Sequence, residues 1–181
     1  MGGGTGSCPV SDKNILNFRL EKMKIDLKKL NQFLYEANAK GYAGGGKEIK
    51  AQRPKFKEIQ YRSGDWYYRD SYSGFFFAPG QEIVYFKNNP IWAMAYSGGM
   101  KEKYHGDVKF AGDTFSFLKN ALMAMDKRKP FRGPKSFKEG DYRYESKVIG
   151  NIKDFIGKEK IFYKNRLVFE QNFIGGLIIA K

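Results

Sequence analysis

The apolar positions of residues 26–40 predict an amphipathic helix. They recur at three- and four-residue spacing, which places them on one face of an α-helix. This face comprises Leu27, Leu30, Leu34 and Ala37. Asp26 is a residue type that caps helix N-termini, and Gly41 is a residue type that ends helices. The pattern therefore predicts a helix that begins at Asp26 and ends at Lys40.

A second helix is predicted over residues 114–125, with Asp113 as its N-cap. Its apolar stripe consists of Leu118, Ala121, Leu122 and Met125. Residues 98–112, which precede it, are interpreted as a polar connector. Residues 126–139 are rich in Lys, Arg, Pro and Gly, and this composition predicts a loop.

Shorter segments that alternate between apolar and polar residues, or that are apolar throughout, predict β-strands. They span residues 58–62, 66–72, 75–77, 81–86, 90–96, 142–148, 159–163 and 167–173. Asn88 and Asn89 predict a hairpin turn, because asparagine tolerates positive φ.

Two of these strands carry a face of large side chains. In residues 66–72 this face consists of Trp66, Tyr68, Asp70 and Tyr72. In residues 90–96 it consists of Trp92, Met94 and Tyr96. Such a face fills a core or lines a pocket, and the alternation leaves both interpretations open.

Residues 64–99 and 140–176 share landmarks in the same order. With one inserted residue, the pairs are Gly64-Asp65 with Gly140-Asp141, Tyr68 with Tyr144, Gly74 with Gly150, Gly80 with Gly157, Glu82 with Glu159, Lys87-Asn88 with Lys164-Asn165, and Gly98-Gly99 with Gly175-Gly176. We interpret them as an internal repeat. It predicts an α+β fold with two pseudo-repeats, each a helix followed by three or four antiparallel strands, packed about a pseudo-twofold axis.

The half-repeats are expected to cover about residues 26–99 and 113–177 of a single domain that spans residues 11–181. The start of the chain is rich in glycine and differs in composition from the rest, so residues 1–10 are interpreted as an expression remnant and disordered tail. Residues 11–25 fit an N-terminal arm that packs on the main body.

Composition narrows the classes of function. The chain has 33 Lys and Arg against 19 Asp and Glu, a formal net charge of +14, and this invites a nucleic-acid interpretation. A compositional bias towards lysine would give the same charge without a nucleic-acid partner. The single cysteine, Cys8, excludes an internal disulfide and favours a reducing, cytoplasmic setting. One histidine and one cysteine argue against a metal site. We expect no cofactor, and no apolar run is long enough to cross a membrane.

The large side chains predict a ligand site. Aromatic walls beside a carboxylate suit a flat or cationic small molecule. The expected ligand-binding residues are Trp66, Tyr68, Asp70, Tyr72, Glu82, Trp92, Met94 and Tyr96. Asp70 or Glu82 would serve as the polar anchor. Asp70 differs from Glu82 because Ser146 occupies its place in the second half, whereas Glu82 has Glu159 as its counterpart.

The chain also resembles a family. The resemblance is carried by Arg53-Pro54, Gly64 to Tyr72, Gly80-Gln81-Glu82, Pro90 to Tyr96, Arg132-Gly133-Pro134 and Gly140-Asp141-Tyr142. These motifs are similar to those of an uncharacterised bacterial and archaeal domain family. The resemblance implies that some members carry the domain behind a helix-turn-helix DNA-binding domain of the xenobiotic-response-element type. It implies no chemistry.

We therefore predict a non-enzymatic module that binds a small aromatic or cationic ligand. Three alternatives stay open. The first is a basic nucleic-acid-binding protein, whose exposed aromatic side chains would stack on bases. The second is a hydrolase-like enzyme that uses Asp70 and Glu82 as acid and base. The third is a homodimer formed through the repeat edges or the N-terminal arm.

Overall fold

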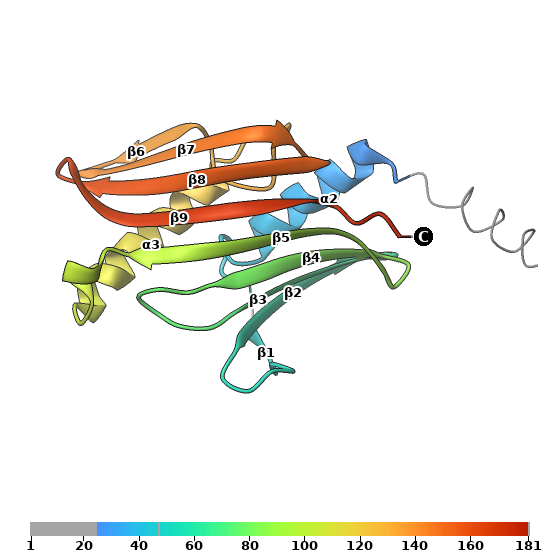
Figure 1. Ribbon diagram of the computed structural model, residues 1–181, viewed down its shortest axis with the longest axis horizontal. Helices are drawn as coiled ribbons and strands as arrows, with labels where there is room; N and C mark the ends of the chain where they lie inside the picture. Colours follow the sequence, from blue (N-terminus) through green and yellow to red (C-terminus); the bar gives the residue numbers. More distant parts are fainter. Residues whose placement is uncertain (1–24, 47, 181) are drawn as a thin grey trace, which may run out of the picture.

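Nine antiparallel strands form one continuous sheet in the computed structural model, which describes residues 25–46 and 48–180 (Figure 1). The strands are β1 (Glu48–Ile49), β2 (Lys57–Ser63), β3 (Trp66–Tyr72), β4 (Gly80–Phe86), β5 (Asn89–Met100), β6 (Ser136–Glu139), β7 (Tyr142–Asn151), β8 (Asp154–Tyr163) and β9 (Arg166–Leu177). Their order across the sheet is β1-β2-β3-β4-β5-β9-β8-β7-β6. The last strand of the sequence therefore lies in the middle of the sheet, between β5 and β8.

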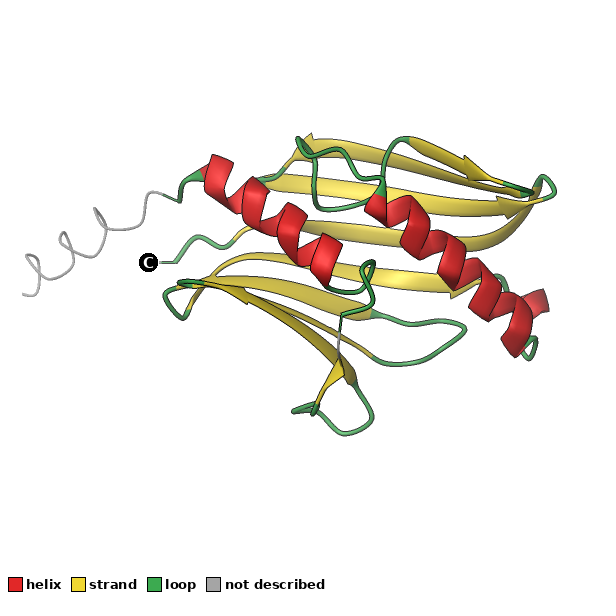
Figure 2. Ribbon diagram, turned by 180° about the vertical axis from the view of Figure 1, so that it is seen from behind, coloured by secondary structure: helices red, strands yellow, loops and turns green. Residues whose placement is uncertain are grey.

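Two α-helices cover one face of this sheet (Figure 2). Helix α2 (Leu27–Lys40) packs against β2 and β3, and helix α3 (Val108–Met123) packs against β6 and β7. A short 3-10 helix, η1 (Glu102–Tyr104), precedes α3. No helix in residues 25–46 and 48–180 is long and apolar enough to span a bilayer.

The predicted α+β fold of two helix-and-strand pseudo-repeats about a pseudo-twofold axis is wrong. The described residues form one nine-stranded antiparallel sheet with two α-helices of 14 and 16 residues, so the protein is mainly β. The local pattern misled because several strands extend through glycines and polar residues that read as connectors. The prediction consequently assigned too little of the chain to the sheet.

The helix predicted over residues 26–40 is confirmed. The Asp26 side chain accepts hydrogen bonds from the backbone N–H groups of Lys28 and Lys29, at 2.9 and 3.2 Å. The backbone N–H of Gly41 donates to the Ala37 carbonyl at 2.7 Å and closes the last turn. The buried face consists of Leu30, Phe33, Leu34 and Ala37. Local capping and a single apolar stripe were sufficient to define this element.

The second helix begins earlier than predicted. Its N-cap is Asp107, whose side chain accepts a hydrogen bond from the Phe110 backbone N–H at 2.9 Å. Asp113, the predicted cap, lies inside the helix and pairs with Lys109 at 3.0 Å. Both aspartates are suitable caps, and Gly112 between them hid the fact that the apolar stripe continues backward to Ala111.

The predicted connector over residues 98–112 is wrong for its first residues, which belong to β5. Gly98 pairs with Gln171 of β9, and a Cβ added at Gly98 would lie 2.3 Å from the Gln171 Cα. A Cβ added at Gly99 would lie 2.0 Å from the Phe76 carbonyl oxygen. Gly98 therefore permits close backbone approach within the sheet, and Gly99 permits close approach of the β3–β4 loop, whereas a pair of glycines considered alone indicates a turn. The predicted loop over residues 126–139 likewise contains β6.

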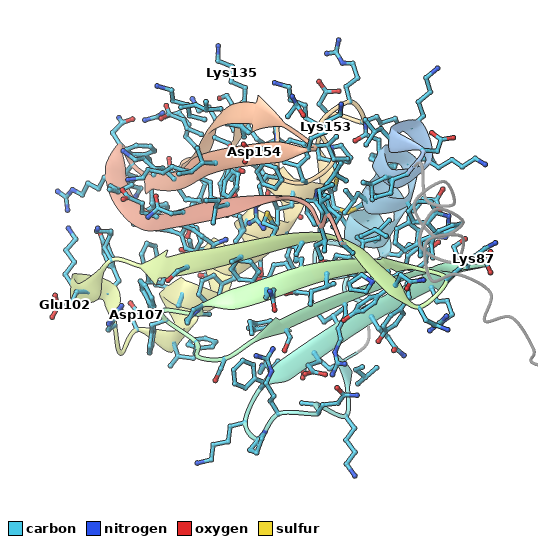
Figure 3. All side chains as sticks on the ribbon, turned by 45° about the vertical axis from the view of Figure 1, so that its right-hand side comes forward. Lys87, Glu102, Asp107, Lys135, Lys153 and Asp154 are labelled. Carbon is cyan, nitrogen blue, oxygen red and sulfur yellow. The ribbon has the colours of Figure 1, made fainter. Side chains whose placement is uncertain are left out.

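Two apolar clusters fill the space between the sheet and the helices. The first joins α2 to the inner face of β3, β4 and β5 and contains Leu34, Val84 and Trp92. The second joins α3 to β7, β8 and β9 and contains Leu118 and Ile161. Many other charged side chains are exposed, among them Lys87, Glu102 and Lys135, which Figure 3 labels.

The expression remnant predicted for residues 1–10 lies outside the described residues. The N-terminal arm predicted for residues 11–25 also lies outside them, except for Ile25, which packs against the first apolar cluster.

Candidate functional site

A cavity of about 300 Å³ lies between the inner face of the sheet and the two helices. Strands β3, β4, β5 and β9 contribute Asp70, Tyr72, Glu82, Tyr96 and Gln171 to its lining. The helix side contributes Asn38, Tyr42, Gly112, Phe115 and Lys119, and the α3–β6 loop contributes Arg132. The cavity is thus walled by aromatic rings and contains carboxylates.

Strand register brings the acidic side chains together. Asp70 of β3 pairs with Glu82 of β4, so both carboxylates point to the same face of the sheet from neighbouring positions. In the next row, Gly80 pairs with Tyr96 of β5. A Cβ added at Gly80 would lie 2.4 Å from the Tyr96 ring. Because this glycine leaves room for the ring, the Tyr96 hydroxyl reaches across β4 and donates to Asp70 Oδ1 at 2.7 Å.

Arg132 forms a buried ion pair beside these two carboxylates. Its Nε donates to Glu159 Oε2 at 3.2 Å, and its Nη2 donates to Glu159 Oε1. Glu159 also accepts from the Tyr144 hydroxyl at 2.7 Å and from Gln171 Nε2 at 3.0 Å. Glu159 thus accepts four hydrogen bonds, and its charge is compensated by a bidentate guanidinium.

Glu82 is less well satisfied than Glu159. Its Oε1 lies 3.6 Å from Arg132 Nη1, but its buried Oε2 has no hydrogen-bond partner among the described residues. Burial and the neighbouring Asp70 raise the pKa of Glu82 to about 8, against the opposing effects of Arg132 and of the Tyr68 hydroxyl. An unpaired buried carboxylate oxygen is costly, so a group that donates to it would be bound favourably.

The pKa of Asp70 is raised by burial to about 6, although the Tyr96 hydrogen bond and Arg132 both act to lower it. The site therefore contains the carboxyl groups of Asp70, Glu82 and Glu159 around the one guanidinium of Arg132. If all were ionised, the cluster would carry a net charge of −2. The interior is thus acidic in a chain whose formal net charge is +14.

A family model for a domain of unknown function, DUF5680, matches residues 70–178. The chain belongs to this family. No curated protein and no solved structure matches the chain.

The DUF5680 match includes the whole acidic cluster, which consists of Asp70, Glu82, Arg132 and Glu159. Asp70 is the first residue of the match, and Gln171, which donates to Glu159, also lies within it. It also includes α3 and the loop that carries Arg132. Helix α2 and strands β1 and β2 lie before it. The cavity is therefore built mainly from the DUF5680 domain, and the preceding segment adds Asn38, Tyr42, Ala43, Glu48 and Lys57.

The eight predicted ligand-binding residues fall into two groups. Four line the cavity: Asp70, Tyr72, Glu82 and Tyr96. The other four belong to the apolar core beneath α2: Trp66, Tyr68, Trp92 and Met94. Trp92 is fully buried, and its Nε1 donates to the Ile152 carbonyl oxygen at 3.0 Å. The alternation that placed these side chains on one face of the sheet was informative, but it does not distinguish cavity from core.

Replacing Trp92 by phenylalanine is expected to destabilise the protein by about 1–3 kcal/mol, because it removes buried volume and leaves the Ile152 carbonyl without its donor. Trp66→Phe is the matched control, because Trp66 is only half-buried between the Phe33 and Phe86 rings. Urea unfolding measures both changes. Equal effects of the two substitutions would contradict the role given to the Trp92 hydrogen bond.

Sequence reasoning did not identify Arg132, Tyr144, Glu159 or Gln171 as site residues. In the sequence Glu159 is only the counterpart of Glu82 in the repeat, and Arg132 lies in a segment rich in basic residues. One signal was available. Arg132-Gly133-Pro134 interrupts a lysine-rich loop, and a Cβ added at Gly133 would lie 2.7 Å from the Tyr144 hydroxyl. This glycine lets the loop lie close over β7 and carry Arg132 into the interior.

The described residues contain no group of three or more His, Cys, Asp or Glu side chains arranged to hold a metal ion. His105 lies away from the cluster, next to η1, where its Nε2 is 3.0 Å from the Met100 carbonyl oxygen.

Proposed function

We propose that this chain is a non-enzymatic binding module that holds one small aromatic or cationic molecule in the cavity between the sheet and the helices. The observation that supports the proposal most directly is Glu82 Oε2, a buried acceptor with no partner among the described residues, in the lining of a cavity. A volume of about 300 Å³ is within the range of small-molecule sites.

The walls of the cavity suit a flat molecule. The Tyr42 and Tyr72 rings meet edge to face with centroids 6.3 Å apart. The Phe75 and Phe115 rings do the same at 5.5 Å. Such rings offer both stacking faces and the negative quadrupole that attracts cations.

The proposal extends to sensing. The sequence resemblance implies that some family members carry the domain behind a helix-turn-helix DNA-binding domain. This arrangement is the one expected of a module that reports a small molecule to a DNA-binding partner.

The first test is native mass spectrometry of the freshly purified protein. We expect a discrete extra mass that is lost on denaturation. A clean mass of the protein alone would leave retention of a ligand unsupported, and the next experiment then decides between a cavity that binds and one that does not.

The second test fills the cavity with a larger side chain at position 112. Gly112 lies within α3 and lines the cavity, and a Cβ added there would meet no atom within 4 Å. Gly112→Leu is therefore expected to occupy the cavity and to reduce ligand binding at least tenfold, while Gly112→Ala retains binding and stabilises the helix by up to about 1 kcal/mol. Isothermal titration measures the affinity, and thermal unfolding measures the stability. Unchanged binding by Gly112→Leu would show that any bound molecule sits elsewhere.

A further inference from the structure

We infer that the ligand of this cavity is an organic cation whose N–H group donates to Glu82 Oε2, and that it enters in exchange for a proton held by the Asp70–Glu82 pair. The inference rests on the proposed function and adds the charge of the ligand, its anchor atom and a linkage to pH.

The carboxylate oxygens of the cluster differ in whether they accept a hydrogen bond within the protein. Both oxygens of Glu159 accept hydrogen bonds within the protein. Asp70 Oδ1 accepts from Tyr96. Glu82 Oε2 is the acceptor left without a partner among the described residues, and the Glu82 side chain is 4% exposed. A donor that enters the cavity therefore finds its acceptor at this atom.

The ionisable groups around Glu82 leave an excess of negative charge. Several titratable and charged groups face it or line the same cavity: Tyr68, Asp70 and Tyr72 from β3, Tyr96 from β5, Glu159 from β8, Arg132 from the α3–β6 loop, Tyr42 from the turn after α2, Glu48 from β1, Lys57 from β2, and Lys119 from α3. Arg132 is engaged by Glu159, so the Asp70–Glu82 pair is left with excess negative charge. A cation compensates this charge and an anion does not.

Two lysines line the cavity without cancelling this preference. Lys57 is exposed and lies 3.5 Å from Glu48. The ammonium of Lys119 lies 5.0 Å from the centroid of the Tyr42 ring. The pKa of Tyr42 is raised by burial, by Tyr72 and by the carboxylates of Asp70 and Glu159, so Tyr42 stays neutral and presents its ring to a cation.

The Asp70–Glu82 pair holds a proton that a bound cation can replace. With pKa values of about 6 for Asp70 and about 8 for Glu82, the pair holds close to one proton at neutral pH. An ammonium or amidinium group favours the ionised form of both carboxyls. The carboxyl O–H bond of the pair then breaks, the proton passes to solvent, and an N–H···O⁻ hydrogen bond forms. The charge of the occupied site equals that of the empty site, because one cation replaces one proton.

The test compares three probes that share a phenyl ring and differ in charge: benzylamine, benzyl alcohol and benzoate. We expect benzylamine to bind the wild-type protein about tenfold more tightly than benzyl alcohol. The ratio of its affinity to that of benzoate should be larger still. Its affinity should rise up to about tenfold per pH unit between about pH 6 and about pH 8. Calorimetry in two buffers of different ionisation enthalpy should report release of about one proton.

Glu82→Gln keeps the shape of the side chain and removes its charge. In this variant the preference for benzylamine over benzyl alcohol should fall to about twofold or less, with little change for the alcohol. Proton release by the wild-type protein is an independent measurement that stands if the variant folds poorly.

The outcomes separate the inference from the proposed function. If benzyl alcohol or benzoate binds as tightly as benzylamine, and Gly112→Leu still blocks binding, the charge assignment is overturned and the cavity site stands. If benzylamine binds without proton release, the exchange is overturned. If none of the probes binds the wild-type protein, both the inference and the small-molecule proposal fail.

Discussion

Replacing Arg132 by methionine is expected to destabilise the protein by about 3–5 kcal/mol at neutral pH. The guanidinium is 8% exposed and is bound by Glu159, with Glu82 at 3.6 Å. Its removal leaves the carboxyls of Asp70, Glu82 and Glu159 buried without a compensating charge. Because a domain of this kind is stable by only about 5–15 kcal/mol, this loss is a large fraction of its stability.

The loss should become smaller as the pH is lowered. Protonation removes the charge that Arg132 no longer compensates, so the Arg132→Met variant regains part of its stability near about pH 5. Urea unfolding at two pH values measures this recovery. Arg128→Met is the matched control, because Arg128 is 89% exposed and pairs with Asp126 only two residues away. We expect that variant to change stability by less than about 0.5 kcal/mol. An equal loss in both variants, or a loss independent of pH, would contradict this account of the cluster.

Glu82→Gln should have the opposite effect and increase stability at alkaline pH. The pKa of Glu82 is about 8 in the folded protein, above the ordinary value of 4.5. Between these two values the unfolded chain releases the proton while the folded chain retains it. The free energy of unfolding therefore falls as pH rises through this window, and the stabilisation is fully present only below it. Removing the carboxyl removes this decline.

At pH 8 the Glu82→Gln variant is expected to be more stable than the wild-type protein by on the order of 3 kcal/mol, and near pH 4.5 the two should be about equal. Asp70, whose pKa is also raised, should preserve a smaller decline between about pH 4 and about pH 6. Chemical unfolding across pH measures both slopes. Glu102→Gln changes an exposed glutamate in η1 and should retain the wild-type profile. If the free energy of unfolding of the Glu82→Gln variant declined with pH as steeply as that of the wild-type protein, the assignment of this proton to Glu82 would be refuted.

Local chemistry defined some elements well and others poorly. Helix α2 and strand β3 were predicted from capping, periodicity and alternation alone, because their own residues carry the information. The fold class was not, because β5 and β9 extend through glycine pairs whose purpose is close contact with another part of the chain. Asn88 was correctly read as a turn residue, but the positive-φ positions are Lys87 and Asn88, one residue earlier than predicted.

The site shows the same division. Asp70 and Glu82, which line the cavity, could be predicted as candidates because they lie among aromatic residues in alternating strands. Arg132 and Glu159 were missed because their partnership spans 27 residues and depends on where a loop folds back. No local pattern records that contact. The acidic character of the interior was equally hidden, because the charge of the whole chain is strongly positive.

The position of β9 in the middle of the sheet has a consequence for how the chain folds as it is made. About 65 residues separate the end of β5 from the start of β9, its partner, so at about 5–20 residues per second roughly 3–13 seconds pass before β5 can be paired on that side. During this interval the edge of β5 offers unpaired backbone groups to any neighbouring chain. Synthesis of this protein is therefore expected to depend on chaperones that shield exposed strand edges, and slower translation of residues 101–165 should increase aggregation.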